Sequence, residues 1–259
     1  MPIKIIRIAA AIAVTLLLSA CVSITETRYS KNANPEKAAE TYVALAVGYL
    51  SQGNMILARQ KLDRALLLDP ENPAVHSAFA MYWLERGEIK LTEQAFATAL
   101  DLDAQHSPTN YHYGVYLMRY KKDKTACDYM AMAAQDVDYS ARVLANENLG
   151  LCLVNGGNSA AAISAFEKAW ILDSHSTVSS MNLTAIYLQR KRVRLASRWF
   201  KRFEQTLTDG KVPHSAASLS LAVQLARVQG DQNAVHSYGF KLKKHFPSSA
   251  EYKSYLSSH

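Results

Sequence analysis

Apolar residues recur at three- and four-residue spacing along most of the chain, in stretches separated by short polar turns. Each stretch runs for about 12–14 residues, and this spacing places its apolar side chains on one face of an α-helix. The stretches come in pairs, and a turn containing Gly53, Gly87 or Gly157 divides the members of a pair. Glycine ends helices readily because it adopts the left-handed conformation at little steric cost. The pattern therefore predicts pairs of amphipathic helices.

The helix pairs repeat with a period of 34 residues. The segment ETYVALAVGYLSQGNMILARQKLDRALLLDP matches VHSAFAMYWLERGEIKLTEQAFATALDLDA after a shift of 34. Further shifts of 34, 36 and 34 reach a third, fourth and fifth copy, and a weaker sixth copy ends at Pro247. Self-similarity at this period is the sequence signature of a helical repeat array. The first two copies align Tyr49 with Trp83, Gly53 with Gly87, Leu62 with Phe96, Ala65 with Ala99 and Asp69 with Asp103.

The period and the residue pattern resemble the tetratricopeptide repeat. Small residues such as Ala65 and Ala99 stand where two helices must approach closely, and large residues such as Phe96 fill the space between them. We expect an all-α fold, a right-handed superhelix of about six tetratricopeptide-like helix pairs. The predicted repeat domain covers residues 38–259, with repeats near 39–72, 73–106, 107–140, 143–176, 177–210 and 216–249.

Two of the copies depart from the pattern. The third has Lys121 where the others carry glycine and Val137 where they carry aspartate, and the fifth has Lys191 at the glycine position. The sixth copy follows a longer connection, TLTDGKVPHSAAS. We still expect helix pairs in these copies, with the first two copies the most regular.

The first twenty residues have the pattern of an export signal. Lys4 and Arg7 precede an apolar run that is too short to span a bilayer, and the run ends in small residues before Cys21. The sequence LLLSAC resembles the bacterial lipoprotein box, which implies cleavage after residue 20 and acylation of Cys21. The alternative is an uncleaved N-terminal anchor that happens to contain cysteine. Cleavage would lower the formal net charge from +7 to +5, because only Lys4 and Arg7 are removed.

The residues after Cys21 indicate the destination. In lipoproteins of Gram-negative bacteria an aspartate at the next position holds the protein at the inner membrane, and here that residue is Val22. The resemblance therefore implies an acylated protein in the outer membrane, facing the periplasm. The polar segment 21–37 is predicted to be the acylated N-terminus and a flexible tether.

No arrangement of residues in the sequence indicates an enzyme. The eight histidines form no metal-binding motif with a carboxylate, and no phosphate-binding or nucleophile motif occurs. We therefore expect no metal, no cofactor and no small-molecule substrate. His76 and His112 fall on the first helices of their repeats, where a surface or groove role fits better than catalysis.

The densest basic stretch runs from Arg190 to Arg202 and covers the turn and second helix of the fifth repeat. A solvated helix face accounts for it, and contact with an acidic partner or lipid headgroups is the alternative. Nucleic acid is not expected as a partner in an exported, lipid-anchored protein.

Cys127 and Cys152 fall on helices that pack together in such a stack. In an oxidising periplasm they can form a disulfide, and two buried free thiols are the alternative.

Stacked first helices line the concave groove of such arrays, and this groove binds extended or helical peptides. The repeat register predicts an apolar protein-binding groove across repeats one to four, although some of its members could instead pack against the neighbouring helix. The predicted groove residues are Val43, Val47, Leu50, Ser77, Met81, Leu84, Tyr111, Val115, Met118, Leu151 and Val154.

Three stretches carry a more specific resemblance: NYHYGVYL, ENLGLCL and SYGFKLKKHFPSSAEYKSYL. They resemble the type IV pilus biogenesis lipoproteins called PilF or PilW, over essentially the whole mature chain. The resemblance implies a pilotin, a lipid-anchored adaptor that binds secretin subunits and promotes their assembly in the outer membrane. A periplasmic scaffold for cell-wall enzymes or outer-membrane protein assembly is the alternative, although it would not share the third stretch.

Overall fold

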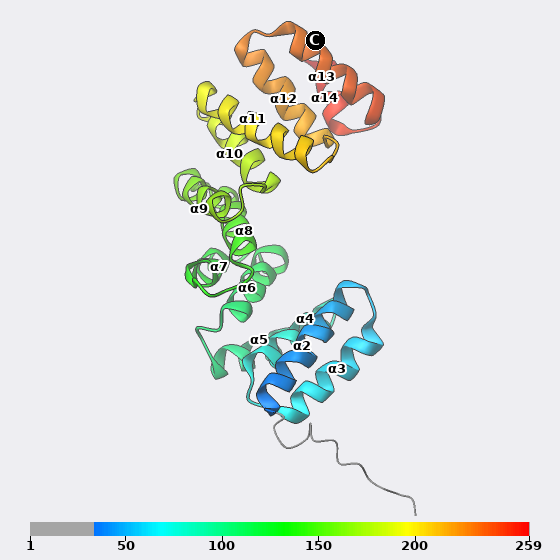
Figure 1. Ribbon diagram of the computed structural model, residues 1–259, viewed down its shortest axis with the longest axis vertical. Coiled ribbons are helices and arrows are strands. Elements are labelled where there is room, and N and C mark those ends of the chain that lie inside the picture. Colours follow the sequence, from blue (N-terminus) through cyan, green and yellow to red (C-terminus); the bar gives the residue numbers. More distant parts are fainter. Residues whose placement is uncertain (1–33, 259) are drawn as a thin grey trace, which may run out of the picture.

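The computed structural model describes residues 34–258, and a series of helices accounts for most of them (Figure 1). Residues 1–22, on which the predictions of a signal peptide and of acylation at Cys21 rest, lie outside the described residues. The helices are α2 (Pro35–Ser51), α3 (Met55–Leu68), α4 (Pro73–Glu85), α5 (Ile89–Leu102), α6 (Ser107–Tyr116), the π-helical segment η2 (Leu117–Lys121), α7 (Ala126–Gln135), α8 (Arg142–Asn155), α9 (Ser159–Leu172), α10 (Thr177–Gln189), α11 (Val193–Asp209), α12 (Ala216–Gln229), α13 (Gln232–His245) and α14 (Ala250–Ser257).

Consecutive helices pack as pairs, and the pairs stack into an elongated array with α2 and α13 at opposite ends (Figure 1). The pairs are α2 with α3, α4 with α5, α6 with α7, α8 with α9, α10 with α11 and α12 with α13. The predicted all-α repeat superhelix is thereby confirmed. Within residues 34–258, no helix has both the length and the hydropathy needed to cross a bilayer.

The helices approach one another at buried small residues. Ala65, Ala99 and Ala133 recur every 34 residues and are completely buried, and Ala162 and Ala169 take the same role in the fourth repeat. A large side chain of the second helix also packs against a small residue of the first helix. In repeat four, for example, a Cβ atom added to Gly150 would lie 2.7 Å from the ring of Phe166. These contacts explain why small and large residues alternate at fixed positions in each copy.

The irregular third repeat contains a local change in helix type. Its first helix continues as the π-helical segment η2, which accommodates one more residue than an α-helical turn. The left-handed residue that ends the helix is consequently Lys122 (φ 52°), one position later than the repeat period predicts from Gly53 and Gly87. Four residues, 122–125, separate η2 from α7, compared with three between α2 and α3, and Ala126 and Ala133 nevertheless keep their repeat positions. In the fifth repeat, Lys191 (φ 57°) takes the left-handed position itself.

The first helix begins earlier than predicted. The predicted tether extends to residue 37, but α2 starts at Pro35. The Asn34 side chain accepts hydrogen bonds from the backbone N–H groups of Glu36 (2.9 Å) and Lys37 (3.3 Å), and proline fits the first helical position because it has no N–H to satisfy. The Asn34–Pro35 pair is therefore a helix start rather than part of a linker.

A short final helix closes the C-terminal end of the array. Helix α14 packs against α12 and α13, and the ring of Tyr255 rests on Gly239 so closely that a Cβ atom there would lie 2.1 Å from the ring. Tyr252 packs against the same core. This helix supplies the polar outer surface that a terminal repeat needs.

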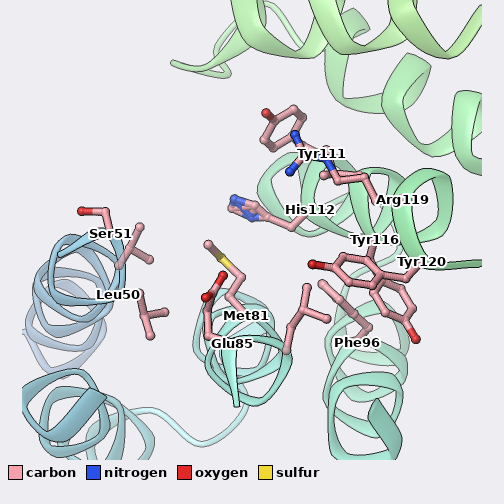
Figure 2. Close-up of a pocket in the computed structure, with 13 residues that line it drawn as sticks. Leu50, Ser51, Met81, Glu85, Phe96, Tyr111, His112, Tyr116, Arg119 and Tyr120 are labelled. Atoms are coloured by element: carbon pink, nitrogen blue, oxygen red, sulfur yellow. The ribbon is translucent and has the colours of Figure 1, made fainter. Parts of the chain in front are cut away.

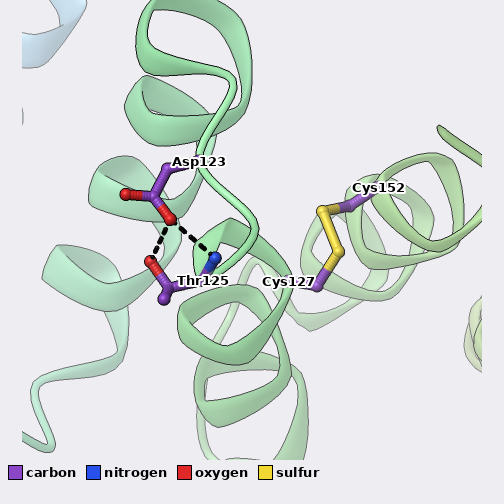
Figure 3. Close-up of a disulfide and its surroundings, with 4 residues drawn as sticks. All are labelled: Asp123, Thr125, Cys127 and Cys152. Atoms are coloured by element: carbon purple, nitrogen blue, oxygen red, sulfur yellow. Dashed lines mark hydrogen bonds between the residues drawn. A yellow bond between two sulfur atoms is a disulfide. The ribbon is translucent and has the colours of Figure 1, made fainter. Parts of the chain in front are cut away.

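A disulfide joins the third and fourth repeats. Cys127 on α7 and Cys152 on α8 are bonded, with their Cα atoms 5.7 Å apart (Figure 3). Nearby, both the backbone N–H and the hydroxyl of Thr125 donate to Asp123 at 2.8 Å, which fixes the turn that leads into α7. The bond therefore ties the irregular repeat to a regular neighbour.

The disulfide is tested by counting thiols. In a chain carrying Cys21→Ser, we expect no free thiol in the denatured, unreduced protein and two after reduction. The double variant Cys127→Ala/Cys152→Ala should lose about 3 kcal/mol of unfolding free energy, because the cross-link limits the entropy of the unfolded chain. Two free thiols before reduction would show that the cysteines are not paired.

Candidate functional site

A pocket of about 330 Å³ opens between the first helices of repeats one, two and three (Figure 2). Helices α2, α4 and α6 supply most of its wall, with one residue from α5 and two from η2. The lining residues are Val47, Leu50, Ser51, Met81, Leu84, Glu85, Phe96, Tyr111, His112, Val115, Tyr116, Arg119 and Tyr120.

Aliphatic side chains from α2 and α4 form one side of the pocket. Val47 and Leu50 lie one helical turn apart on α2, and Met81 and Leu84 do the same on α4. Such spacing puts each pair on one helix face. Val47, Met81 and Leu84 are half-buried, so part of their apolar surface is left to a ligand. The flexible thioether of Met81 points into the pocket in Figure 2 and can adapt to different shapes.

Aromatic rings form the floor on the other side. The buried rings of Phe96 and Tyr116 have centroids 5.7 Å apart, and Tyr120 stacks on Tyr116 at 5.7 Å. Tyr113 joins the cluster behind them, 5.2 Å from Phe96. Contacts of this kind hold the rings in fixed positions, so the floor of the pocket is preformed.

A polar contact holds η2 against the second repeat. The Tyr116 hydroxyl donates to Glu93 on α5 at 3.0 Å, and Lys121 at the end of η2 forms an ion pair with the same carboxylate. The pKa of Glu93 is lowered mainly by the Lys121 contact and further by the Tyr116 hydrogen bond. The segment that carries Arg119 and Tyr120 is thereby anchored at both ends.

The half-buried His112 is a polar group in the wall of the pocket. Its ring projects toward Met81, and its Nδ1 atom is buried with no hydrogen-bond partner among the described residues (Figure 2). Burial, aided by the nearby His106, lowers the pKa of His112 from 6.5 to about 4. The imidazole is therefore neutral at neutral pH and adds no charge to an otherwise apolar wall.

Tyr111 marks the boundary of the pocket toward repeat four. Its hydroxyl accepts a hydrogen bond from the side-chain amide of Asn148 on α8 at 3.1 Å, and its ring lies 6.3 Å from that of Tyr139. Burial raises the pKa of Tyr111, so the hydroxyl stays neutral. The side chain therefore connects the pocket to α8.

The structure brings together six of the eleven predicted groove residues: Val47, Leu50, Met81, Leu84, Tyr111 and Val115. The other five do not line this pocket. Ser77 is buried between helices, while Val43, Met118 and Leu151 pack against the cores of repeats one, three and four. Val154 is exposed at the end of α8. The predicted strip across four repeats thus lies partly in a pocket that spans three, and its role in protein binding stays a prediction.

The repeat register does not predict the polar residues at the rim of the pocket. Glu85 and Ser51 lie at helix ends, and Arg119 and Tyr120 lie on η2, whose wider turn the regular register does not describe. A signal for the last two exists in the sequence, because Lys121 replaces the expected glycine and the next repeat follows after 36 residues instead of 34.

The residues of the pocket suit the binding of a ligand better than they suit catalysis. Its wall is mainly aliphatic and aromatic, with one acidic and one basic side chain at the rim. Among residues 34–258, no three His, Cys, Asp or Glu side chains gather closely enough to hold a metal ion. That the chain is not an enzyme and needs no cofactor stays a prediction.

Comparison with known proteins finds two relatives of similar sequence. The type IV pilus assembly protein PilF of Pseudomonas aeruginosa is 28% identical over 220 residues, 85% of each chain. An uncharacterized protein of Haemophilus influenzae is 31% identical over 136 residues, which are 52% of this chain and 74% of that one. No protein-family model matches.

Solved structures agree with these relatives. The structure of Pseudomonas aeruginosa PilF superposes with a TM-score of 0.77 at 28% identity, over 88% of this chain and all of that one. PilW, a type IV pilus biogenesis factor, gives 0.70 at 20% identity over 84% and 98% of the two chains, which supports the fold.

The stacked pairs and the pocket on their first helices define a tetratricopeptide-repeat protein. More narrowly, the chain is a type IV pilus biogenesis protein with tetratricopeptide repeats, similar to PilF over most of its length.

Burial of His112 predicts a pH-dependent stability. Its pKa is lower in the folded than in the unfolded state, so the unfolded state binds more protons between pH 6.5 and 4. The contribution of His112 to stability is therefore complete above that window and is lost as the pH falls through it. In urea unfolding, His112→Gln should reduce the loss of unfolding free energy between pH ~7 and pH ~4.5 by about 2 kcal/mol. An unchanged loss in His112→Gln would contradict the prediction.

Proposed function

We propose that this protein is a pilotin, an outer-membrane lipoprotein that binds the type IV pilus secretin and promotes its localisation and assembly. The observation that carries the proposal is the similarity to PilF over 85% of both chains. The partner that we infer is a segment of the secretin, and the binding site is the pocket between α2, α4 and α6.

The pocket suits an apolar segment of a protein partner. It offers aliphatic side chains on one side and fixed aromatic rings on the other, and each apolar side chain seated there would contribute about 1.5–3 kcal/mol. Glu85 and Arg119 at the rim can pair with charges that flank the apolar residues of the segment. Neutral His112 adds a hydrogen-bonding group without a charge.

The proposed location at the outer membrane rests on the N-terminal sequence. Lys4, Arg7 and the lipoprotein-box residues before Cys21 support export and acylation, and Val22 supports the outer membrane. Two or more acyl chains give stable anchoring, whereas one chain binds only marginally. The segment 21–34 would then hold the repeat array at the periplasmic face.

The proposal is tested by deleting the gene. We expect the secretin to remain monomeric or misplaced and surface pili to be lost, because unassisted subunits do not reach the outer membrane. The measurement is the amount of heat-resistant secretin multimer in outer-membrane fractions, with the restored gene as the control. Normal multimers in the deletion strain would refute the pilotin proposal.

The position of the binding site is tested separately. Met81→Glu places a carboxylate within the apolar wall, and we expect capture of the secretin from outer membranes to fall at least tenfold, because binding would desolvate the charge. Leu67→Glu is the matched control, since Leu67 is 74% exposed on α3 and lies outside the pocket. Thermal unfolding should be similar for both variants. Equal capture by both variants would place the secretin elsewhere.

A further inference from the structure

Charge is divided unevenly along the array. Residues 34–176, which form repeats one to four, contain 12 basic and 17 acidic residues. Residues 177–258, which form repeats five and six and α14, contain 13 basic and 4 acidic residues. The end of the molecule far from α2 is thus strongly cationic, while the remainder is mildly anionic (Figure 1).

The positive charge of repeat five is gathered on one side of α11. The helix buries its other side through Ala196, Phe200, Phe203 and Leu207. The basic side chains of α11 and of the turn before it are all exposed, and no ion pair among residues 34–258 involves them. They are Arg190, Lys191, Arg192, Arg194, Arg198, Lys201 and Arg202.

Helix α13 extends this surface. It contacts α11 through Tyr238, whose hydroxyl donates to Glu204 at 2.7 Å and whose ring lies 6.3 Å from that of Phe200. Its outer side carries Lys241, Lys243 and Lys244, which are also exposed. The exposed lysines and arginines of α11, α13 and the turn before α11 are called the basic face below.

An exposed aromatic ring stands among these lysines. Phe240 on α13 is 64% exposed and directly precedes Lys241. It lies opposite the buried side of the helix, which carries Val235, Gly239 and Leu242. A phenyl ring held in water beside several cations is the composition of a surface that contacts membranes, where the ring enters the headgroup boundary and the cations remain at the phosphates.

We propose that the basic face binds anionic phospholipid headgroups, so that repeats five and six rest on a membrane surface. The cations are spread over two neighbouring helices and a turn, which matches a broad layer of phosphates better than one short acidic segment. Phe240 also favours lipid over an acidic protein, because a membrane offers its ring an apolar region directly beneath the phosphates that the cations contact. The inference concerns a surface distinct from the pocket.

Vesicle flotation tests the proposal without any secretin, so its outcome is independent of the pilotin proposal. The protein used starts at residue 21 and carries Cys21→Ser, so it lacks both the predicted signal peptide, whose apolar run would itself bind lipid, and the proposed acylation. Vesicles of phosphatidylcholine containing phosphatidylglycerol are compared with vesicles of phosphatidylcholine alone, at low and high salt. We expect tighter binding to the anionic vesicles and loss of the difference at high salt, because salt screens exposed charges.

Matched variants identify the surface responsible. The triple variant Arg194→Gln/Arg198→Gln/Lys201→Gln should weaken binding to anionic vesicles on the order of a hundredfold, at about fivefold for each side chain. The control Arg64→Gln/Lys90→Gln/Lys168→Gln removes the same charge from exposed positions on α3, α5 and α9 and should bind nearly as the parent chain does. Phe240→Ser should weaken binding roughly tenfold, whereas Ile171→Ser, at a residue 79% exposed on α9, should not.

Three results would overturn the proposal. They are equal binding of the parent chain to neutral and anionic vesicles, equal losses in the two triple variants, and binding to polyglutamate but not to anionic vesicles. The last result would assign the basic face to an acidic polypeptide. Circular dichroism of each variant confirms that the helices are retained.

Discussion

The described array depends on the close approach of paired helices at residues with little or no side chain. The buried alanines let two backbones meet, and rings such as Phe166 fill the space that remains. Interiors packed in this way leave no room for an added methyl group without displacement. Because the same contact recurs in each repeat, the helices of every pair pack in the same way, and the stacked pairs place three first helices around one pocket. The pocket is thus a consequence of the core.

The pocket and the proposed basic face lie on different sets of helices. The pocket belongs to the first helices of repeats one to three, while the basic face belongs to the second helices of repeats five and six. Second helices have one side free of the core, so their outer residues can change without cost to packing. First helices are more constrained, since residues such as Leu50 and Tyr116 serve the core and the pocket together.

Much of the fold could be predicted because a core contact that recurs in each repeat requires the same residue types at a fixed spacing in the sequence. Ala65, Ala99 and Ala133 stand 34 residues apart, and their burial is the physical reason for the period. Which residues line the pocket could be predicted less well from the sequence. Position in the repeat does not distinguish Ser77, which its neighbours bury, from Met81 one turn later. It also does not reveal that the Tyr111 hydroxyl would accept a hydrogen bond from Asn148. The π-helical turn at η2 also changes the register locally, which a regular helical pattern cannot describe.

The contact between Tyr255 and Gly239 has a consequence for the length of the molecule. A stack of helix pairs ends in a surface shaped to receive another pair, so an uncovered end would accept a second copy of the chain and start a filament. Tyr255 on α14 covers Gly239 at this end, so another helix pair could not pack there without displacing α14. One glycine and one tyrosine therefore close the C-terminal end of the stack.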